Sequence, residues 1–292
     1  MFHFTYLQSI VIGLLQGVTE LFPISSLGHA VLLPAWLGGS WESFAKSDQY
    51  LLVTIAFHLA SAVALFLVFS KRWFRIISTT YLSLRRGEFV GSGIQLLARL
   101  VIGTIPVAIL GKLFSDSLQS TFGAPLRAGI FLTLNGLILF GVERLTRTRH
   151  SHVHAVDPDA AIVERVSLGQ AFLVGVGQSL ALFPGISRFG ISMTAGMMRG
   201  LNRAVASDFA FLLAFPAILG AGLLKAPKLL AAGAIAHDSV GPLLLGIGVA
   251  FVATFVSVTF LVRWFKHHTL NGFAAYCLLV GGLSIIRFGL FA

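Results

Sequence analysis

Long apolar stretches dominate this chain and decide what it can fold into. Six of them lie near 49–70, 94–114, 125–143, 206–224, 241–262 and 272–290. Each is close to the roughly 20 residues that a helix needs to cross the hydrocarbon layer of a bilayer. The sequence therefore predicts an all-α polytopic membrane protein with about six full transmembrane helices.

The composition excludes a soluble domain. Hydrophobic residues make up 56% of the 292 residues and charged residues only 11%, whereas soluble domains carry about 25% charged residues. The N-terminus lacks the basic flank of a cleaved secretory signal. The net charge of +10 comes from lysines and arginines that flank apolar stretches, which favours contact with anionic lipid over nucleic acid. Cys277 is the single cysteine, which excludes an intrachain disulfide and a cysteine-based metal site.

Two further pairs of apolar stretches are interrupted. The pairs are 4–22 with 25–38 and 167–183 with 188–200. Pro23 and Pro184 stand at the interruptions, and proline removes a backbone donor and clashes with the preceding helical turn. Non-helical backbone at membrane depth persists only where protein or a wet cavity covers it. We therefore expect two re-entrant helical hairpins.

The distribution of basic residues supports two hairpins. If both pairs re-enter, most lysines and arginines between the spans fall on one side, which the positive-inside rule assigns to the cytoplasm. The two hairpins then enter from opposite sides, as in an inverted-topology repeat with a site near the midplane. The chain would be one integral membrane domain, 1–292, with repeats at about 1–143 and 165–292.

A polar cytoplasmic linker, 144–164, is expected between the two repeats. Its alternating His150, His152 and His154 resemble a metal-binding tract. A solvated loop is the favoured interpretation, because this is the only long polar stretch of the chain.

The first interrupted pair carries a glutamine and a carboxylate. Gln16 and Glu20 are four residues apart, so on a helix they share one face. Their oxygens are hard ligands of the kind that Mg²⁺ or Ca²⁺ prefers, and an ionisable group at membrane depth indicates function. The alternative is a carboxylate at a helix end, satisfied by nearby backbone groups.

Small and hydroxyl residues follow Pro23. A helix that starts near Ser25, close to Gly28, would offer free N–H groups to an anion. Ser26 is a candidate nucleophile if a base lies within reach. His29 is the candidate acid or base, with a hydrogen-bonded core residue as the alternative. His58 stands alone in an apolar span and is interpreted as a core residue.

The second interrupted pair repeats this design with an arginine. Its candidate substrate-binding residues are Gln178, Gly185, Ser187, Gly190 and Ser192. Glycines allow close approach of a ligand, and the planar guanidinium of Arg188 matches phosphate oxygens. The alternative for Arg188 is a salt bridge to Glu20 that locks the hairpins together. Elsewhere, Asp208 is expected to neutralise Arg203.

Together these groups suit hydrolysis of a phosphoanhydride. Oxygen ligands, a hydroxyl with a base and an arginine at two helix starts would all lie within the membrane. A substrate that reaches them should bring its own hydrophobic anchor, as a lipid diphosphate does.

At both segments the sequence resembles the undecaprenyl-diphosphate phosphatase family, often called BacA-type bacitracin-resistance proteins. The family's first motif, (Glu/Gln)-x-x-x-Glu followed by Pro-x-Ser-Ser-x-Gly-His, is complete here from Gln16 to His29. The second motif, Pro-Gly-x-Ser-Arg-Ser-x-x-Thr, is matched through Arg188. It then departs at Phe189, where serine is usual, and at Ser192, where threonine is usual. The resemblance covers nearly the whole chain.

The resemblance implies removal of the terminal phosphate from undecaprenyl diphosphate, which recycles the lipid carrier of cell-wall synthesis. It implies catalytic roles for Glu20, Ser26, His29 and Arg188, and metal binding by Gln16 and Glu20. It also implies the bacterial cytoplasmic (inner) membrane, with the active site opening to the outer, periplasmic side.

The sequence is also compatible with functions other than hydrolysis. The chief alternative is a transporter or flippase of polyprenyl phosphate, since inverted repeats commonly alternate access. An anion channel is less favoured, because the Glu20 carboxylate would face its pore. Small residues such as Gly246 and Gly248 are consistent with helix contacts within one chain or in a homodimer.

Overall fold

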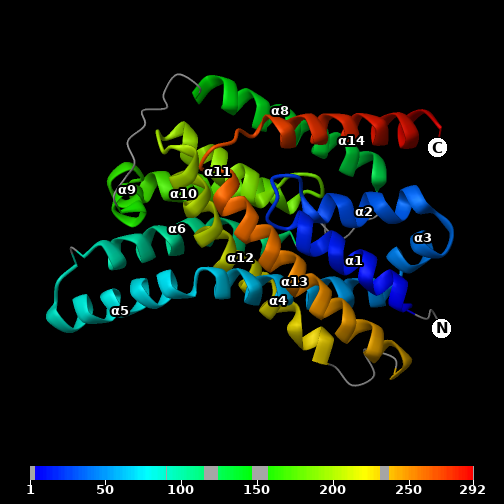
Figure 1. The fold of residues 1–292 in the computed structure, drawn as a ribbon, viewed down its shortest axis with the longest axis horizontal. Helices are drawn as coiled ribbons and strands as arrows, with labels where there is room; N and C mark the ends of the chain where they lie inside the picture. The colour runs from blue at the N-terminus through cyan, green and yellow to red at the C-terminus, as the bar shows by residue number, and fades with distance from the viewer. Residues whose placement is uncertain (1–3, 90, 115–123, 147–156, 231–236, 292) are drawn as a thin grey trace.

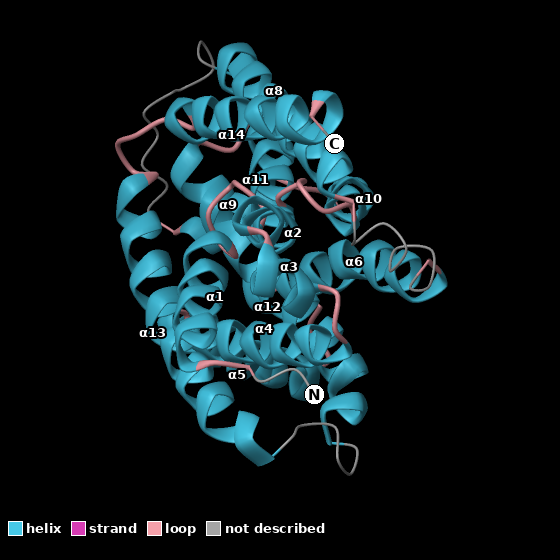
Figure 2. Cartoon of the chain, turned by 90° about the vertical axis from the view of Figure 1, so that its right-hand side faces the viewer, coloured by secondary structure: helices cyan, strands magenta, loops and turns pink. Residues whose placement is uncertain are grey.

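The computed structural model describes residues 4–89, 91–114, 124–146, 157–230 and 237–291. Every element within these ranges is a helix, and no strand occurs there (Figures 1 and 2). Six of the described helices are long and apolar enough to cross a membrane. They are α4 (Asp48–Val68), α6 (Ser92–Leu113), α8 (Pro125–Thr146), α12 (Arg203–Leu230), α13 (Val240–Trp264) and α14 (Asn271–Leu290). The predicted all-α polytopic fold is confirmed.

The two interrupted pairs are helix pairs that break where the prolines predict. The first consists of α1 (Tyr6–Thr19) and α2 (Ser26–Leu37), and the second of α10 (Leu168–Gln178), the short 3₁₀ helix η2 (Ser179–Leu182) and α11 (Arg188–Met198). In Figure 1, α1 runs inward from the N-terminus and α2 returns toward the same edge. Pro23 and Pro184 lie in the two breaks.

Both pairs begin and restart with the same capping chemistry. Thr5 and Ser167 each form a capping box, in which a hydroxyl and a glutamine satisfy N–H groups at the helix start. After the breaks, Ser25 and Ser187 cap α2 and α11 by accepting hydrogen bonds from the N–H groups of Gly28 and Gly190. Each hairpin therefore has a proline in its break and a serine that caps its second helix.

The two hairpins pack against each other's span helices. Helix α1 packs along α13, and α10 packs along α6. Gly17 and Gly175 allow these approaches, because a Cβ on either would meet the backbone of the facing helix. Helix α8 packs on α14, and α4 packs on α12. This exchange of partners is the pattern that two repeats of opposite topology would produce; the division at 1–143 and 165–292 remains a prediction.

Three shorter α-helices and the 3₁₀ helix η3 (His237–Ser239), which precedes α13, complete the described chain. Helix α3 (Gly39–Ala45) connects α2 to α4, α5 (Ser70–Arg86) follows α4, and α9 (Pro158–Arg165) precedes α10. In Figure 1, α9 and the α5–α6 connection lie at the left, whereas both termini lie at the right. Of the linker 144–164, residues 147–156 lie outside the described residues, and with them His150, His152 and His154.

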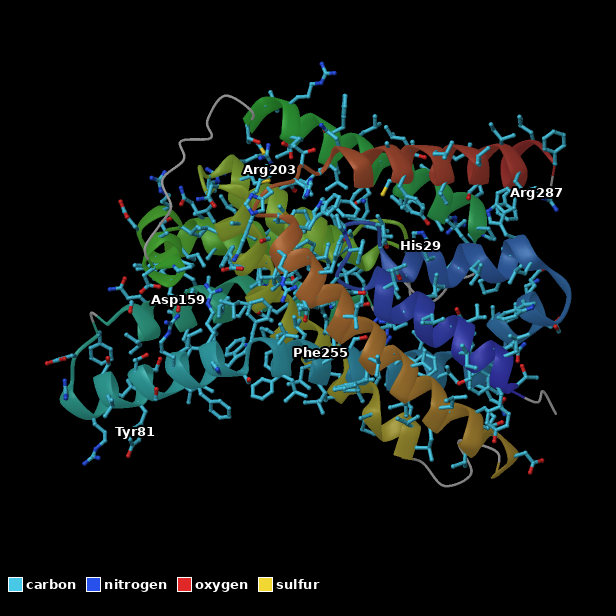
Figure 3. All side chains as sticks on the ribbon, in the orientation of Figure 1. His29, Tyr81, Asp159, Arg203, Phe255 and Arg287 are labelled. Carbon is cyan, nitrogen blue, oxygen red and sulfur yellow. The ribbon has the colours of Figure 1, made fainter. Side chains whose placement is uncertain are left out.

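Ion pairs join the elements at the left-hand end, where Figure 3 labels Asp159 and Arg203. Arg72 donates hydrogen bonds to Asp159 at 2.6 Å and to Asp208 at 2.9 Å. Arg203 instead donates to Glu143, which also accepts the N–H of Leu270 at 3.1 Å. The expected Asp208–Arg203 pair is therefore wrong. The two residues are five apart on α12, and the helix turns their side chains toward different neighbours.

Removing Glu143 should destabilise the fold strongly. The Glu143 side chain is buried (3% exposed as a residue), and its loss would leave the Arg203 guanidinium and the Leu270 N–H unpaired. Breaking a buried pair on one side costs about 3–5 kcal/mol, whereas replacing both partners by apolar residues is often close to neutral. Thermal unfolding in detergent should show a much lower melting temperature for Glu143→Ala. The double variant Glu143→Leu with Arg203→Leu should recover most of the wild-type melting temperature. Equal melting temperatures for the wild type and Glu143→Ala would contradict this.

Candidate active site at the junction of the two hairpins

The break of the first hairpin turns directly onto the break of the second. Ser25 has a positive φ of 70°, a strained geometry for a residue with a side chain. Its hydroxyl accepts hydrogen bonds from Gly28 N at 3.2 Å and from Gly185 N at 3.1 Å. Ser25 is therefore a cap for α2 and a tie between the loops, so its hydroxyl is already occupied by backbone donors.

Glycine is required at this junction because the loop backbones touch. A Cβ added at Gly28 would lie 2.8 Å from Gly185 Cα and 2.9 Å from Gly185 N. Gly185 itself has a φ of 114°, which side chains rarely adopt. A Cβ at Gly190 would lie 3.3 Å from Pro23. These three predicted site glycines thus shape the close contact between the breaks.

Glu20 is the centre of a buried polar cluster. It caps the end of α1 and is 7% exposed. Its Oε2 accepts hydrogen bonds from Gln16 Nε2 at 2.8 Å and from Ser26 Oγ at 2.5 Å. The predicted shared face of Gln16 and Glu20 is therefore present. The structure also places the Ser26 hydroxyl directly on the carboxylate, which is the geometry of a nucleophile beside a base.

His58, interpreted from sequence as a core residue, belongs to this cluster. Its Nε2 lies 3.3 Å from Glu20 Oε2, and its Nδ1 lies 2.7 Å from the carbonyl oxygen of Thr54. Both ring nitrogens therefore face oxygen acceptors. The contact with Glu20 was not predicted from the sequence, because the packing of α4 turns His58 toward the first hairpin.

His29 lies in the same region but does not contact Ser26 through a hydrogen bond. Its Nδ1 lies 2.7 Å from the carbonyl oxygen of Ser25, and its Nε2 lies 2.8 Å from the hydroxyl of Tyr276. A carbonyl only accepts, so Nδ1 carries a proton and Nε2 can accept from Tyr276. Of the two bases considered for Ser26, the geometry favours Glu20 over His29. Tyr276 is a partner that no motif predicted.

Arg188 provides free donors at the start of α11. Its Nε and Nη1 are shielded from solvent and have no hydrogen-bond partner, and the same holds for the Ser192 hydroxyl. Positions four apart on a helix share a face, so the guanidinium and this hydroxyl lie on one side of α11. Unpaired buried donors are costly, and an oxyanion would satisfy them.

The locking salt bridge between Glu20 and Arg188 is not formed. The two groups are close enough for their charges to attract, yet the basic side chain in contact with Glu20 is that of His58. The carboxylate and the guanidinium therefore lie in one region without a hydrogen bond between them. This is the arrangement expected when a ligand oxygen, and not the carboxylate, accepts the hydrogen bonds of the guanidinium.

The remaining predicted residues have structural contacts. Ser187 is 1% exposed and donates its hydroxyl to the carbonyl of Phe22 at 3.2 Å. Gln178 is fully buried and donates to Gly103 O at 3.3 Å, while its Oε1 has no partner. Phe189, the motif departure, stacks on Phe211 with ring centroids 4.4 Å apart. Its ring points into the core, so it does not line the region around the Arg188 guanidinium.

The donor set fits one divalent ion that is shared with a substrate. Glu20 Oε1 makes no hydrogen bond to the described residues, and the Gln16 amide and Ser26 hydroxyl adjoin the same carboxylate. No group of three or more His, Cys, Asp or Glu side chains that could hold a metal occurs among the described residues. Mg²⁺ is often bound by one or two carboxylates together with waters and phosphate oxygens. Such a substrate-dependent site fits, whereas a closed protein cage does not.

Substituting Gly28 by alanine should separate the two breaks. Its Cβ would overlap the Gly185 backbone, and overpacking of this kind costs roughly 1–3 kcal/mol. Gly248 is a matched control, because a Cβ there meets nothing within 4 Å. Thermal unfolding should show a lower melting temperature for Gly28→Ala and no loss for Gly248→Ala. Equal stability of the two variants would show that the contact between the breaks is loose.

Comparison with known proteins places the chain in a family. The family model described as bacitracin resistance protein BacA matches residues 9–283. An undecaprenyl-diphosphatase 2 of Frankia alni is 38% identical over 99% of this chain and 100% of the relative. Undecaprenyl-diphosphatases of Mycolicibacterium paratuberculosis and Acidiphilium cryptum are each 38% identical, over 97% of this chain and 97% and 98% of those proteins. This chain belongs to the BacA family.

Proposed function

We propose that this protein hydrolyses undecaprenyl diphosphate to undecaprenyl phosphate and inorganic phosphate. The observation that carries the proposal is the pairing of the Ser26 hydroxyl with Glu20, close to an arginine whose donors are unpaired. A nucleophile with its base and a cation that holds the phosphoryl oxygens are two parts that phosphoryl transfer uses. Family membership and the names of the relatives support the same substrate.

The first step forms a bond between Ser26 Oγ and the terminal phosphorus. Glu20 accepts the hydroxyl proton, and Arg188 with Ser192 holds the oxygens of the terminal phosphoryl. The bond to the bridging oxygen breaks, and the lipid phosphate leaves. Water then hydrolyses the phosphoserine and releases inorganic phosphate. If water attacks directly in place of Ser26, the same carboxylate takes its proton.

A divalent cation belongs to this proposal. Glu20 Oε1, the Gln16 amide oxygen and the diphosphate would hold Mg²⁺ or Ca²⁺, which would neutralise charge on the substrate. Chelation should therefore reduce turnover. The proposed setting is the bacterial inner membrane. Helices α5 and α9, which carry Arg72, Arg75 and Arg165, lie at the end of the molecule away from both termini, and the positive-inside rule assigns that end to the cytoplasm. We place the opening of the site on the other, periplasmic side.

Phosphate release in detergent tests the function directly. The purified chain with undecaprenyl diphosphate and Mg²⁺ should release phosphate, and Glu20→Gln or Arg188→Ala should reduce the rate by at least about 10²-fold, as for loss of a group that stabilises the transition state. The Glu42 side chain is 46% exposed and pairs with Lys46, so Glu42→Gln is a matched control and should retain full rate. A transporter without hydrolase activity would release no phosphate. Detergent leaves no compartments, so transport does not contribute to the result.

The Ser26 step has its own test. Substrate labelled in the terminal phosphate should leave label on the wild-type protein after an acid quench, because a phosphoserine forms. Ser26→Ala should take up no label and lose most of its turnover. Turnover at the wild-type rate in Ser26→Ala would assign the attack to water.

His58 should contribute through its contact with Glu20. A hydrogen bond to a charged group is worth about 1.5–3 kcal/mol, so His58→Leu should lower kcat by roughly 10- to 100-fold. His58→Gln keeps an N–H donor and should retain more activity than His58→Leu. Unchanged kcat/KM in both variants would return His58 to a packing role.

A further inference from the structure

Asn135 is the described side chain that contacts both breaks from a third helix. It lies on α8 and is completely buried. Its Oδ1 accepts the backbone N–H of Ser187 at 3.0 Å, and its Nδ2 donates to the carbonyl oxygen of Pro23 at 2.9 Å. One amide thus joins the loop of the first hairpin to the loop of the second.

The two backbone groups need this partner. Pro23 lies between α1 and α2, where its carbonyl has left the helical ladder, and Ser187 is the N-cap of α11, whose N–H has no acceptor within that helix. Buried backbone groups without a partner are rare and costly. A carboxamide supplies one acceptor and one donor together, so Asn135 satisfies both groups at once.

The position of these contacts gives Asn135 control over the site. Pro23 precedes Ser26 by three residues, and Ser187 is the residue before Arg188. Two direct hydrogen bonds also join the loops, from Gly185 N to Ser25 Oγ and from Ser187 Oγ to Phe22 O. With the Asn135 tie and these two bonds present, the distance between the Ser26–Glu20 pair and the guanidinium is fixed by short contacts.

We propose that Asn135 is a positioning residue that sets the separation between the Ser26 loop and the Arg188 loop. The proposal rests on the proposed hydrolase function. Without Asn135, Arg188 still binds the terminal phosphoryl, but the phosphorus no longer lies in line with the attacking oxygen. A displacement of about 1 Å can lower a rate by about 10²-fold, so the effect should appear in kcat.

Kinetics of two variants test the proposal. Asn135→Leu, similar in size but without hydrogen bonds, should lower kcat by about 10- to 100-fold with KM within about threefold of the wild-type value. Ser284→Ala is the matched control. Ser284 on α14 is also fully buried, and its hydroxyl accepts a hydrogen bond from Trp36 Nε1 on α2 at 3.1 Å. It should keep the wild-type kcat.

A double-mutant cycle separates positioning from general damage. If Asn135 acts by placing Arg188, then Asn135→Leu should add less than about threefold to the loss already caused by Arg188→Ala. Ser284→Ala combined with Arg188→Ala should be additive. A full, additive loss from Asn135→Leu in the Arg188→Ala background would overturn the proposal.

Cys277 provides a readout that does not depend on activity. It is the only cysteine of the chain, and its buried Sγ lies 3.4 Å from Asn135 Nδ2 and 3.8 Å from the Pro23 carbonyl oxygen. In Asn135→Ala the tie is lost, so local opening of the structure around Cys277 becomes easier. The rate at which a membrane-permeant maleimide labels Cys277 should therefore rise by about tenfold. Ser284→Ala should label at the wild-type rate.

The two readouts distinguish the two claims. No phosphate release by the wild type would refute the hydrolase proposal alone, and the labelling rates would still decide whether Asn135 ties the breaks together. Wild-type labelling of Asn135→Ala would overturn the tie. A KM that rises with unchanged kcat in Asn135→Leu would overturn the positioning role, because it would indicate loss of binding.

Discussion

Broken backbone inside an apolar helical protein is the constraint on which this structure depends. Each break exposes N–H and C=O groups that lipid cannot satisfy. The protein satisfies them by bringing the breaks together: the Ser25 hydroxyl accepts Gly185 N–H, and Asn135 joins Pro23 to Ser187. Glycines at the contact allow the backbones to approach closely enough for these hydrogen bonds. The hairpins are therefore stable as a pair.

The same pairing creates the chemistry. Helices α2 and α11 restart at breaks that contact each other, and the N-terminus of a helix favours an anion. The first hairpin brings a carboxylate and a hydroxyl to that region, and the second brings a guanidinium with unpaired donors. Surrounding apolar packing, such as Phe189 on Phe211, keeps bulk water away and strengthens charge interactions. A phosphate on a lipid tail could reach such a site without leaving the membrane.

The sequence predicted the parts of the site that depend on local spacing. Gln16, Glu20 and Ser26 meet because they lie on one helical face and its following turn, and proline marks both breaks. His58, Tyr276 and Asn135 could not be found in this way. Each lies on a span whose rotation is set by packing against distant helices, and apolar neighbours give no periodic signal. The wrong Asp208–Arg203 pairing has the same cause, since Glu143 comes from α8.

A structure of the protein bound to a non-hydrolysable lipid diphosphate and Mg²⁺ would decide where the substrate binds. We expect the terminal phosphoryl between Arg188 and Ser26, with the guanidinium donors occupied and the ion on Glu20. A diphosphate bound elsewhere, with Arg188 turned away from Glu20 and Ser26, would contradict the account.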